Sequence, residues 1–396
     1  MKIMFNTYYD KIYKGEGGTI NFTKNFIKNF SKKNHELVGL ILHGKKEKDN
    51  IIEVSRTKRK DHEILDVTLR LNSFDIVETK KRKIPKSTVL PRKLLCDFFL
   101  QEKPDIFFLN GFSIAYWYLF DAATKAGIPV VVVHHGLWFK EFKNISKKST
   151  KEAFFLMRKM ERDVSRRAAK EVFLNELCLK EYEKGLKIKV DKKRAAVISY
   201  PYNEIFTKGS KKLKSRKDDR ALKIGMVGRW DPIKNPQALI DLSKAAKKNG
   251  KDWRFFLVTR VSKNHVLKSQ KKVISRHVEV VPPMPPKKLA KFFQRMDLLI
   301  LPSEFETFAS VVSEAILQKR FTLVSPNVGW SDIYRKNELE NWIIDFGDPY
   351  KVIERIEKNC FQEVPKQFLN YFEKEFRAKK IFDDYEKLFK SIKKKI

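Results

Sequence analysis

Short apolar runs rich in β-branched and aromatic residues alternate with helical patterns along the chain, and this alternation restricts the fold most. The runs are ELVGLIL, DIFFLN, PVVVVHH, EVFLN and AAVISY, then LKIGMVG, RFFLVT, VEVVP, DLLILP and FTLVS. Strands separated by helices form parallel sheets that are covered by those helices. The length of 396 residues exceeds that of one usual domain. We therefore predict an α/β protein with two domains, each built on its own parallel sheet.

A charged stretch without apolar periodicity, TKGSKKLKSRKDDR, separates the two halves and is the predicted linker, 207–220. A solvated loop within one domain is the alternative. The predicted domains are then 1–206 and 221–372. The last segment, 373–396, carries aromatic residues at helical spacing and is predicted to be a helix that docks on the protein.

The chain is strongly basic, with 84 Lys and Arg against 48 Asp and Glu and a net charge of +36. Such a charge attracts polyanions, and by itself it leaves nucleic acid, an anionic membrane surface and phosphate-bearing substrates open. The three cysteines are far apart and lack metal-ligand spacing, which is typical of a reducing compartment without structural zinc. The most apolar span, 105–120, is too short to cross a membrane and contains Asn110. We predict a cytoplasmic protein whose membrane contact, if any, is peripheral.

Two cations follow the strand LKIGMVG. Gly228 ends this strand, Arg229 comes next, and Lys234 stands beside a predicted helix start at Asn235-Pro236. Cations at a helix N-terminus suit a diphosphate, because the free backbone N–H groups and the helix dipole favour the same anion. The alternative is that both are ordinary surface cations of a lysine-rich chain.

Acidic residues follow the strand DLLILPS in the segment EFETFASVVSEA, 304–315. Open parallel sheets bind ligands at the carboxyl ends of their strands. Glu306 in the turn and Glu314 about two turns into the helix can face one ligand, and carboxylates accept hydrogen bonds from hydroxyl groups. The alternative is that Glu304 or Glu306 only stabilises the helix N-terminus.

Together these motifs resemble glycosyltransferase family 4. The resemblance rests on GRWDPIK, LLILPS, the E-x7-E spacing, GW-SDI at 329–333 and DFGD at 345–348, and in the first half on the Gly17-Gly18 pair, PVVVVHHG and AAVISYPYNEIF. It implies the GT-B architecture, in which two Rossmann-like domains face a central cleft and the C-terminal helix, 373–396, packs back on the N-terminal domain. It also implies a retaining enzyme with a nucleotide-sugar donor, an acceptor-binding first domain and a donor-binding second domain.

The resemblance further implies the roles of individual residues. Arg229 and Lys234 match the cations on the donor diphosphate, Glu314 the residue that binds the ribose, and Glu306 the residue at the transferred sugar. His135 matches a histidine near the sugar C6 hydroxyl, whereas His134 is predicted to point into the sheet. The implied catalytic residues are Arg229, Lys234, Glu306 and His135, and the implied donor-binding residues are Gly17, Gly18, Gly228, Thr307, Phe308 and Glu314.

Several positions depart from the family pattern, among them Thr307, Ala309, Lys319, Phe321, Thr259, Tyr200 and Asn203. Thr307 and Ala309 stand where the family has a Gly-x-Gly, and Lys319 stands at the glycine of its G-x-P. Glu304 is predicted to be a solvated or helix-end charge.

The family reaction is described as attack of the acceptor hydroxyl from the face that the nucleotide leaves, which requires charge stabilisation rather than a protein nucleophile. The chain contains no Asp-x-Asp. We therefore predict that it needs neither a metal nor another cofactor, because Lys and Arg neutralise the diphosphate.

The acceptor is predicted to be a saccharide or lipid-linked saccharide in cell-surface polysaccharide or lipopolysaccharide biosynthesis. The basic and partly apolar segments 21–33 and 140–170 suggest that the first domain rests on the anionic inner face of the cell membrane. The alternative is that these apolar residues are ordinary core residues.

Two other functions remain open at this point. A nucleotide-sugar epimerase of similar fold would need titratable groups at the sugar, and His134 and His135 are the candidates. A nucleic-acid-binding protein would fit the charge, but the basic residues are spread along the chain and no zinc finger, RRM signature or basic zipper is present. We therefore predict no nucleic-acid partner.

Overall fold

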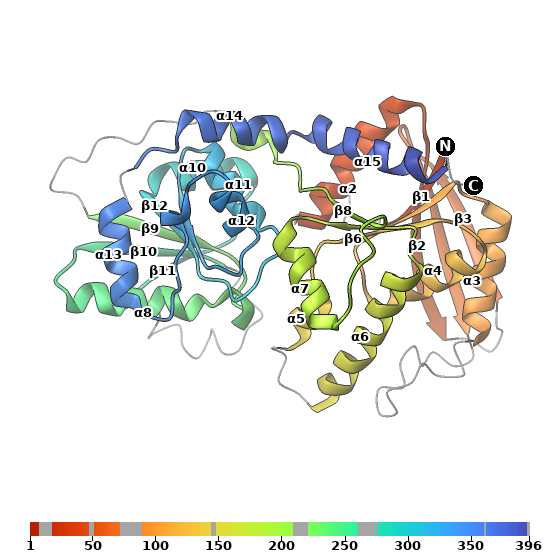
Figure 1. The fold of residues 1–396 in the computed structure, drawn as a ribbon, viewed down its shortest axis with the longest axis horizontal. Helices are drawn as coiled ribbons and strands as arrows, with labels where there is room; N and C mark the ends of the chain where they lie inside the picture. Colours follow the sequence, from red (N-terminus) through yellow and green to blue (C-terminus); the bar gives the residue numbers. More distant parts are fainter. Residues whose placement is uncertain are drawn as a thin grey trace. The chain divides into compact units, whose positions relative to one another are not determined.

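The structure is a computed structural model and describes residues 1–7, 18–46, 51–71, 89–143, 148–208, 221–259, 274, 276–359 and 362–393. It divides into a first unit, Met1–Pro201 with Ala378–Ile396, and a second unit, Tyr202–Arg377. Each unit contains a sheet with parallel strands and covering helices, so the predicted α/β fold is confirmed (Figure 1). Most of the predicted linker, together with Gly17 and Cys360, lies outside the described residues.

The described strands of the first unit form one sheet in the order β3-β4-β2-β1-β5-β6-β7-β8. All neighbours in it are parallel except β3 and β4. The strands are β1 (Lys2–Asn6), β2 (Glu36–Lys46), β3 (Ile51–Lys58), β4 (Glu63–Leu71), β5 (Ile106–Asn110), β6 (Val130–His134), β7 (Lys170–Phe173) and β8 (Ala195–Val197).

The antiparallel pair β3 and β4 is an addition that the sequence analysis did not predict. β3 is an edge strand whose residues are mostly exposed, so its sequence IIEVSRTK lacks the continuous apolar run of a buried parallel strand. The alternation in EILDVTLRL is the signal that could have revealed β4, because alternating residues line opposite faces of a strand.

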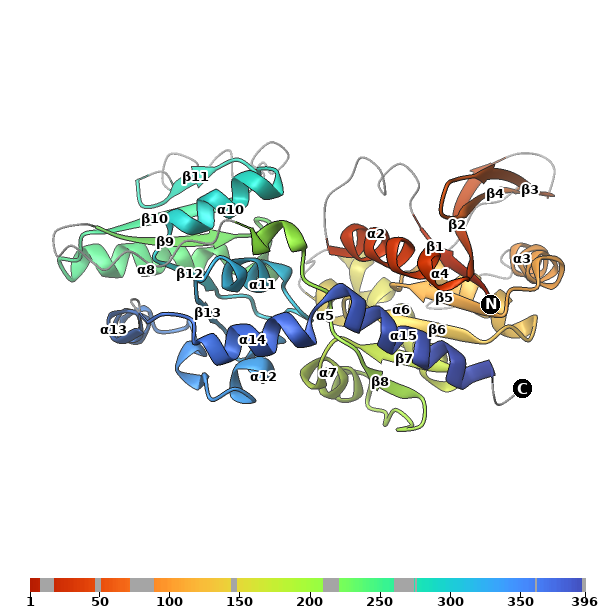
Figure 2. The ribbon, with the colours of Figure 1, turned by 90° about the horizontal axis from the view of Figure 1, so that it is seen from above.

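Helices of the first unit cover this sheet. They are α2 (Gly18–Phe30), α3 (Val89–Glu102), α4 (Ile114–Lys125), α5 (Trp138–Lys143), α6 (Lys148–Arg167), α7 (Glu176–Leu186) and α15 (Ala378–Lys393). Helices α2 and α15 lie side by side (Figure 2). Between them Phe22 and Phe382 have ring centroids 5.3 Å apart, and Phe30 and Phe389 have centroids 5.5 Å apart.

This packing explains the aromatic residues of 21–33. Phe22, Phe26 and Phe30 recur every fourth residue, and all are buried in the core of the first unit. They are therefore core residues, as the alternative to the membrane hypothesis states. In α6 the side chains of Leu156, Met157 and Met160 are buried as well, whereas Phe155 is exposed.

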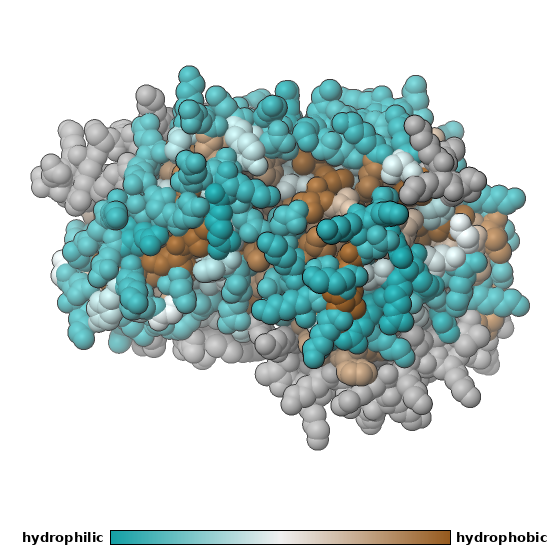
Figure 3. Space-filling model, viewed as in Figure 1, coloured by the Kyte–Doolittle hydropathy of each residue, from teal (hydrophilic) through white to brown (hydrophobic). Residues whose placement is uncertain are grey.

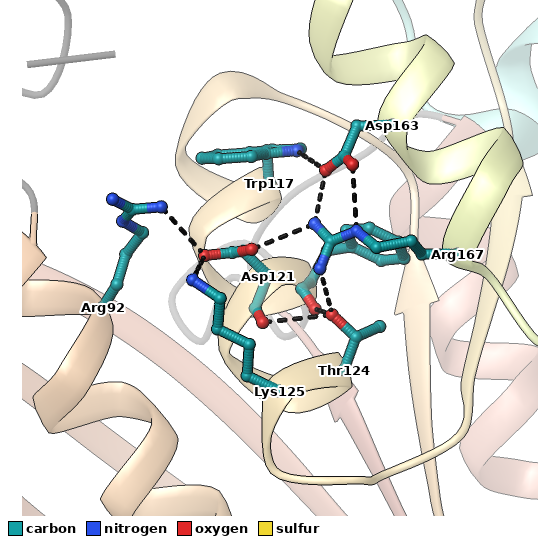
Figure 4. A network of polar contacts seen from close by, with 8 residues as sticks. Arg92, Trp117, Asp121, Thr124, Lys125, Asp163 and Arg167 are labelled. Atoms are coloured by element: carbon teal, nitrogen blue, oxygen red, sulfur yellow. Dashed lines mark hydrogen bonds and ion pairs between the residues drawn. The ribbon is translucent and has the colours of Figure 1, made fainter.

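A buried carboxylate connects three helices of the first unit (Figure 4). Asp121 on α4 is 3% exposed and forms ion pairs with Arg92 of α3, Lys125 of α4 and Arg167 of α6, at 3.2, 2.9 and 3.0 Å. Arg167 also contacts Asp163, which accepts a hydrogen bond from the indole of Trp117. This network fixes the three helices relative to one another.

The second unit contains a five-stranded sheet, within the described residues, in the order β11-β10-β9-β12-β13 with every pair parallel. Its strands are β9 (Leu222–Val227), β10 (Trp253–Val258), β11 (Glu279–Val281), β12 (Leu298–Leu301) and β13 (Thr322–Val324). Its α-helices are α8 (Pro236–Lys248), α10 (Pro286–Arg295), α11 (Ser310–Leu317), α12 (Trp330–Arg335), α13 (Pro349–Asn359) and α14 (Lys366–Glu375).

The end of the chain contains two helices, α14 and α15, separated at Phe376 and Arg377. The predicted helix spanned 373–396, so part of it belongs to α14 in the second unit and part to α15 in the first unit. Phe376 stacks on Trp330 with centroids 5.9 Å apart, which ties this turn to the core of the second unit.

Polar side chains cover most of the face that Figure 3 displays, in keeping with the charged composition. Among the described residues, none of the helices combines the length and the apolar character that crossing a membrane requires.

Candidate functional site

The candidate site of the second unit is built on two neighbouring parallel strands, β9 and β12. These strands pair directly, so their carboxyl ends lie at the same edge of the sheet. The loop after β9 contains Arg229 and a 3-10 helix, Pro232–Lys234, and the loop after β12 contains Glu306. The backbone N–H of Glu304 donates to the carbonyl of Ile233 at 2.8 Å, which holds the two loops together.

An ion pair between the Lys234 ammonium and the Glu306 carboxylate occupies this edge. Both side chains are mostly buried, with 19% and 14% of their surface exposed. The Ser303 hydroxyl donates to the same Glu306 oxygen at 3.2 Å. The sequence analysis did not single out Ser303, although its place directly after a strand is the signal that could have found it.

The backbone of Glu306 is fixed by the loop after β13. Its N–H donates to the carbonyl of Asn327 at 3.3 Å, and its carbonyl accepts from the N–H of Gly329 at 2.9 Å. The carboxylate is therefore held by an ion pair and a hydroxyl group, and both the backbone N–H and the backbone carbonyl of Glu306 form hydrogen bonds. Such preorganisation suits a group that must orient a ligand.

Glu314 lies in the second turn of α11, on the element that follows Glu306. It is half-buried, and its carboxylate has no hydrogen bond or ion pair to any other residue that the structure describes. Burial raises the pKa of Glu314 to about 8, because the ionised form loses hydration. A carboxyl group that is kept from water without a counter-ion is more typical of a ligand site than of a core.

Arg229 and Gly228 lie at the end of β9 in an open environment. The Arg229 guanidinium is 72% exposed, with Nη1 3.9 Å from a carboxylate oxygen of Asp231. A Cβ at Gly228 would meet no atom of the described residues within 4 Å, so no packing contact with that part of the chain requires a glycine there. Arg229 is thus free to move toward a ligand, whereas Lys234 is already held in place.

Thr307 and Phe308 are buried parts of the same loop. The Phe308 ring packs against Trp330 and Phe376, with centroids 5.6 and 5.9 Å apart, and this contact anchors the start of α11. We expect any contribution of these two residues to donor binding to come from their backbone amides. Glu304 is exposed.

The remaining predicted site residues belong to the first unit. His135 follows β6, is half-buried, and its Nε2 lies 2.6 Å from Oδ1 of Asn110. His134 is fully buried, with Nε2 3.0 Å from a Glu171 oxygen, so the prediction that it points into the sheet is confirmed. Gly18 is the exposed first residue of α2.

Among the described residues, no group of three or more His, Cys, Asp or Glu side chains could hold a metal ion. Whether the reaction proceeds without a metal stays a prediction.

Solved structures with a similar fold include three synthases. Sucrose-phosphate synthase from Thermosynechococcus elongatus has a TM-score of 0.70 at 12% identity, with 100% of each chain covered. The catalytic domain of starch synthase IV from Arabidopsis thaliana, bound to ADP and acarbose, has a TM-score of 0.62 at 12% identity and 98% coverage of both chains. An α,α-trehalose-phosphate synthase (UDP-forming) from Burkholderia xenovorans, in complex with glucose-6-phosphate, has a TM-score of 0.64 at 10% identity, with 98% of this chain and 99% of that chain covered. The fold is that of the GT-B glycosyltransferases.

The sequence comparison gives the family of the second unit. Residues 208–374 match the family "Glycosyl transferases group 1". No curated protein matches the sequence of the whole chain. The second unit thus matches the group 1 glycosyltransferases in sequence, and the chain as a whole has the GT-B fold.

Proposed function

We propose that the protein is a retaining glycosyltransferase that uses a nucleotide-sugar donor. The observation that carries this proposal is the Lys234–Glu306 ion pair at the adjoining ends of β9 and β12. The pair places a cation, which can bind the negatively charged diphosphate, beside a carboxylate, which can accept hydrogen bonds from sugar hydroxyl groups. It therefore complements the two parts of a sugar diphosphate. Arg229, in the loop after β9, and Glu314, on α11, supply a second cation and a second carboxyl group for the diphosphate and the ribose.

In the proposed reaction an acceptor hydroxyl oxygen forms a bond to the anomeric carbon of the donor, and the bond from that carbon to the diphosphate breaks. The bonding electron pair goes to the diphosphate, and the hydroxyl proton is transferred to a diphosphate oxygen. Lys234 and Arg229 stabilise the negative charge that develops on the leaving group. Glu306 orients the sugar hydroxyls and holds Lys234 in position before the donor binds.

The first test is binding of the donor. We expect one class among UDP-, GDP-, ADP- and CMP-sugars to raise the melting temperature, with and without magnesium. At a ligand concentration of 100 Kd the expected stabilisation is about 2.7 kcal/mol. Lys234→Ala and Glu314→Gln should abolish it, whereas the control variants Lys248→Ala on α8 and Glu354→Gln on α13, both exposed, should retain it.

The second test is turnover. Removing one preorganised donor to a developing negative charge costs roughly 10²–10³ in kcat, and we expect a loss of this size for Lys234→Ala. Retention is checked by the anomeric configuration of the product. A Lys234→Ala enzyme with unchanged kcat, or a product of inverted configuration, would refute this mechanism.

For the acceptor, we propose a saccharide or lipid-linked saccharide in cell-surface polysaccharide or lipopolysaccharide biosynthesis, used by a cytoplasmic enzyme that contacts the membrane peripherally. The net charge of +36 supports contact with an anionic surface, although the aromatic residues of α2 do not contribute to it. Co-sedimentation with anionic and neutral vesicles tests the contact. Transfer to glucose-6-phosphate in solution, with no effect of vesicles, would instead indicate a small sugar-phosphate acceptor.

A further inference from the structure

A basic hollow lies on the first unit, over the C-terminal half of α7 and the residues that follow this helix. It has a volume of about 470 Å³. Its lining residues are Lys180, Glu183, Lys184, Lys187, Ile188 and Lys189. All four lysines among them are exposed. A concave surface with this lining concentrates positive potential, which attracts anions more strongly than scattered surface lysines do.

The acidic residues of this region already have partners. One oxygen of Glu183 accepts from Lys189 Nζ and the other from the backbone N–H of Val190, each at 3.0 Å. Burial of Glu183 opposes its ionisation, but these two contacts outweigh burial and hold its pKa below the ordinary value. Glu181 pairs with Lys140 of α5. Neither carboxylate is therefore left over for the remaining lysines of the hollow.

Three lysines of the hollow carry charge that the protein does not neutralise. The ammonium groups of Lys180, Lys184 and Lys187 form no hydrogen bond or ion pair within the described ranges of the chain. Lys180 and Lys184 are one turn apart on α7, and Lys187 follows three residues later, so the three share one face. Like charges at this spacing repel one another, and a bound anion would remove the repulsion.

Two arginines of α6 make the end of α7 more favourable for an anion. Arg158 donates to the carbonyl of Gly185, and Arg162 donates to the carbonyl of Leu186 at 2.8 Å. The free carbonyl groups at the C-terminus of a helix carry partial negative charge, which repels anions. The two guanidinium groups offset this charge and add two cations next to the residues that line the hollow.

The hollow lies at the amino edge of the sheet. Helix α7 follows β7 and precedes β8, which is parallel to β7, so the C-terminus of α7 returns to the edge where both strands begin. His135, in contrast, follows the carboxyl end of β6, and open parallel sheets bind substrates at that edge. A ligand in the hollow is therefore separate from the substrate-binding edge of the first unit.

We propose that the hollow formed by Lys180, Lys184 and Lys187 is a second, non-catalytic site, and that it binds phosphate groups. A phosphate has enough charge and acceptor oxygens to contact more than one ammonium group. The lining contains no aromatic side chain on which a nucleobase could stack, so the ligand is a phosphate group without a base. The phosphates belong either to lipid headgroups, which would hold the protein on a membrane, or to a soluble phosphorylated molecule. This site goes beyond the proposed glycosyl transfer and does not depend on it.

The first experiment measures binding of inorganic pyrophosphate by isothermal titration calorimetry. Every protein used carries Lys234→Ala, so that the proposed donor site of the second unit contributes as little as possible. The test variant also carries Lys180→Gln, Lys184→Gln and Lys187→Gln. The matched control instead carries Lys247→Gln and Lys248→Gln on α8 and Lys291→Gln on α10, which are exposed as well. The two variants have the same net charge.

We expect pyrophosphate to bind the parent protein and to bind the test variant roughly tenfold more weakly or worse, because three exposed ion pairs are lost together. The control should bind about as well as the parent. Added salt should weaken binding to the parent, since exposed charges are screened. No binding to the parent, or equal affinities of the test and control variants, overturns the proposal.

Vesicles distinguish the two sources of phosphate. Co-sedimentation is measured with vesicles of phosphatidylcholine alone and with vesicles that also contain phosphatidylglycerol. If the test variant loses binding to the mixed vesicles and the control does not, the hollow binds lipid headgroups. If both variants sediment equally but only the test variant loses affinity for pyrophosphate, the ligand is a soluble phosphate. Because every protein lacks Lys234, failure of the proposed glycosyl transfer would change neither result.

Discussion

Lys319 ends α11 in a backbone conformation that favours glycine. Its φ is +58°, its N–H donates to the carbonyl of Ile316, and the N–H of Arg320 donates to the carbonyl of Ala315, at 2.8 and 2.9 Å. This is the bonding pattern of a Schellman motif, in which the left-handed residue is usually glycine. The family pattern has a glycine at this position. Ala309 also stands where the family has a glycine, and its backbone is left-handed as well, with a φ of +63°.

We expect Lys319→Gly to raise the free energy of unfolding by about 1 kcal/mol, because glycine adopts a positive φ without the clash of a Cβ. Lys319→Ala is the control: it removes the same charge and keeps the strain, so it should bring no gain. Chemical denaturation of the second unit, followed through Trp330 or Trp342, measures the difference. Equal stability of the glycine and alanine variants would show that the backbone is not strained there.

Glu314 should make the stability of the protein depend on pH. Its pKa is about 8 in the folded chain, against an ordinary value of 4.5, so the folded state holds a proton that the unfolded state releases. Below about pH 4.5 Glu314 is protonated in both states, and the protein has the full stability that this group allows. As the pH rises from about 4.5 toward about 8 the unfolded state loses the proton first, so the free energy of unfolding falls. Because the side chain is only half-buried, we expect a loss of roughly 1–3 kcal/mol rather than the full value.

Glu314→Gln tests this expectation, since glutamine cannot ionise. The variant should be more stable than the original at about pH 9 and similar to it at about pH 5, whereas the exposed control Glu354→Gln should follow the original throughout. Urea unfolding at several pH values gives the difference. A constant offset between the two proteins at every pH would mean that Glu314 titrates normally.

The closeness of Lys234 and Glu306 could be predicted from the residues because it follows from position. Lys234 and Glu306 are both in loops after strands, and the structure joins them in one ion pair. The environment of Glu314 could not be predicted, since its raised pKa depends on which neighbours exclude water. The partner of His135 was equally hidden, because Asn110 comes within 2.6 Å of it only when β5 and β6 pair.

At the scale of elements, continuous apolar runs identified the strands of both parallel sheets, since strands buried on both faces carry few polar residues. The edge strand β3 and its antiparallel neighbour β4 lack this signal. The helical spacing of the aromatic residues at the end of the chain predicted a helix correctly but did not reveal the break at Phe376 and Arg377. Aromatic residues of α14 and α15 continue the same spacing across this break.

The contacts between α3, α4 and α6 depend on one carboxylate, and this gives a prediction for Asp121. Asp121→Asn removes the negative charge between Arg92, Lys125 and Arg167 and leaves partly buried cations close together. Breaking a buried ion pair costs roughly 3–5 kcal/mol, and we expect the fall in the free energy of unfolding to lie at the lower end of this range because the cations are partly exposed.

The control for this prediction is Asp241→Asn on α8, where the carboxylate is half exposed and pairs only loosely with Lys244. It should cost less than about 1 kcal/mol. High salt should weaken the difference only slightly, because the Asp121 contacts are shielded from solvent. If both variants lose the same small amount, the network of Figure 4 contributes little to the stability of the first unit.

At the scale of the whole molecule, the chain leaves the first unit after Pro201 and returns to it at Ala378. The returning helix α15 supplies Phe382, Tyr385 and Phe389, each 0% exposed, to the core of the first unit. The first unit therefore lacks part of its core until the last helix is made. The second unit, Tyr202–Arg377, is continuous in sequence and does not include α15.

Deleting 378–396 should therefore unfold one unit and spare the other. Loss of a buried aromatic side chain costs about 3–5 kcal/mol, so losing three approaches the whole stability of a typical domain. Hydrogen exchange should show loss of protection in β1, β5 and β6 and unchanged protection in β9 and β12, whereas deletion of 394–396 alone should change neither set. Equal loss of protection in both sheets would mean that the two units unfold together and that their stability is shared.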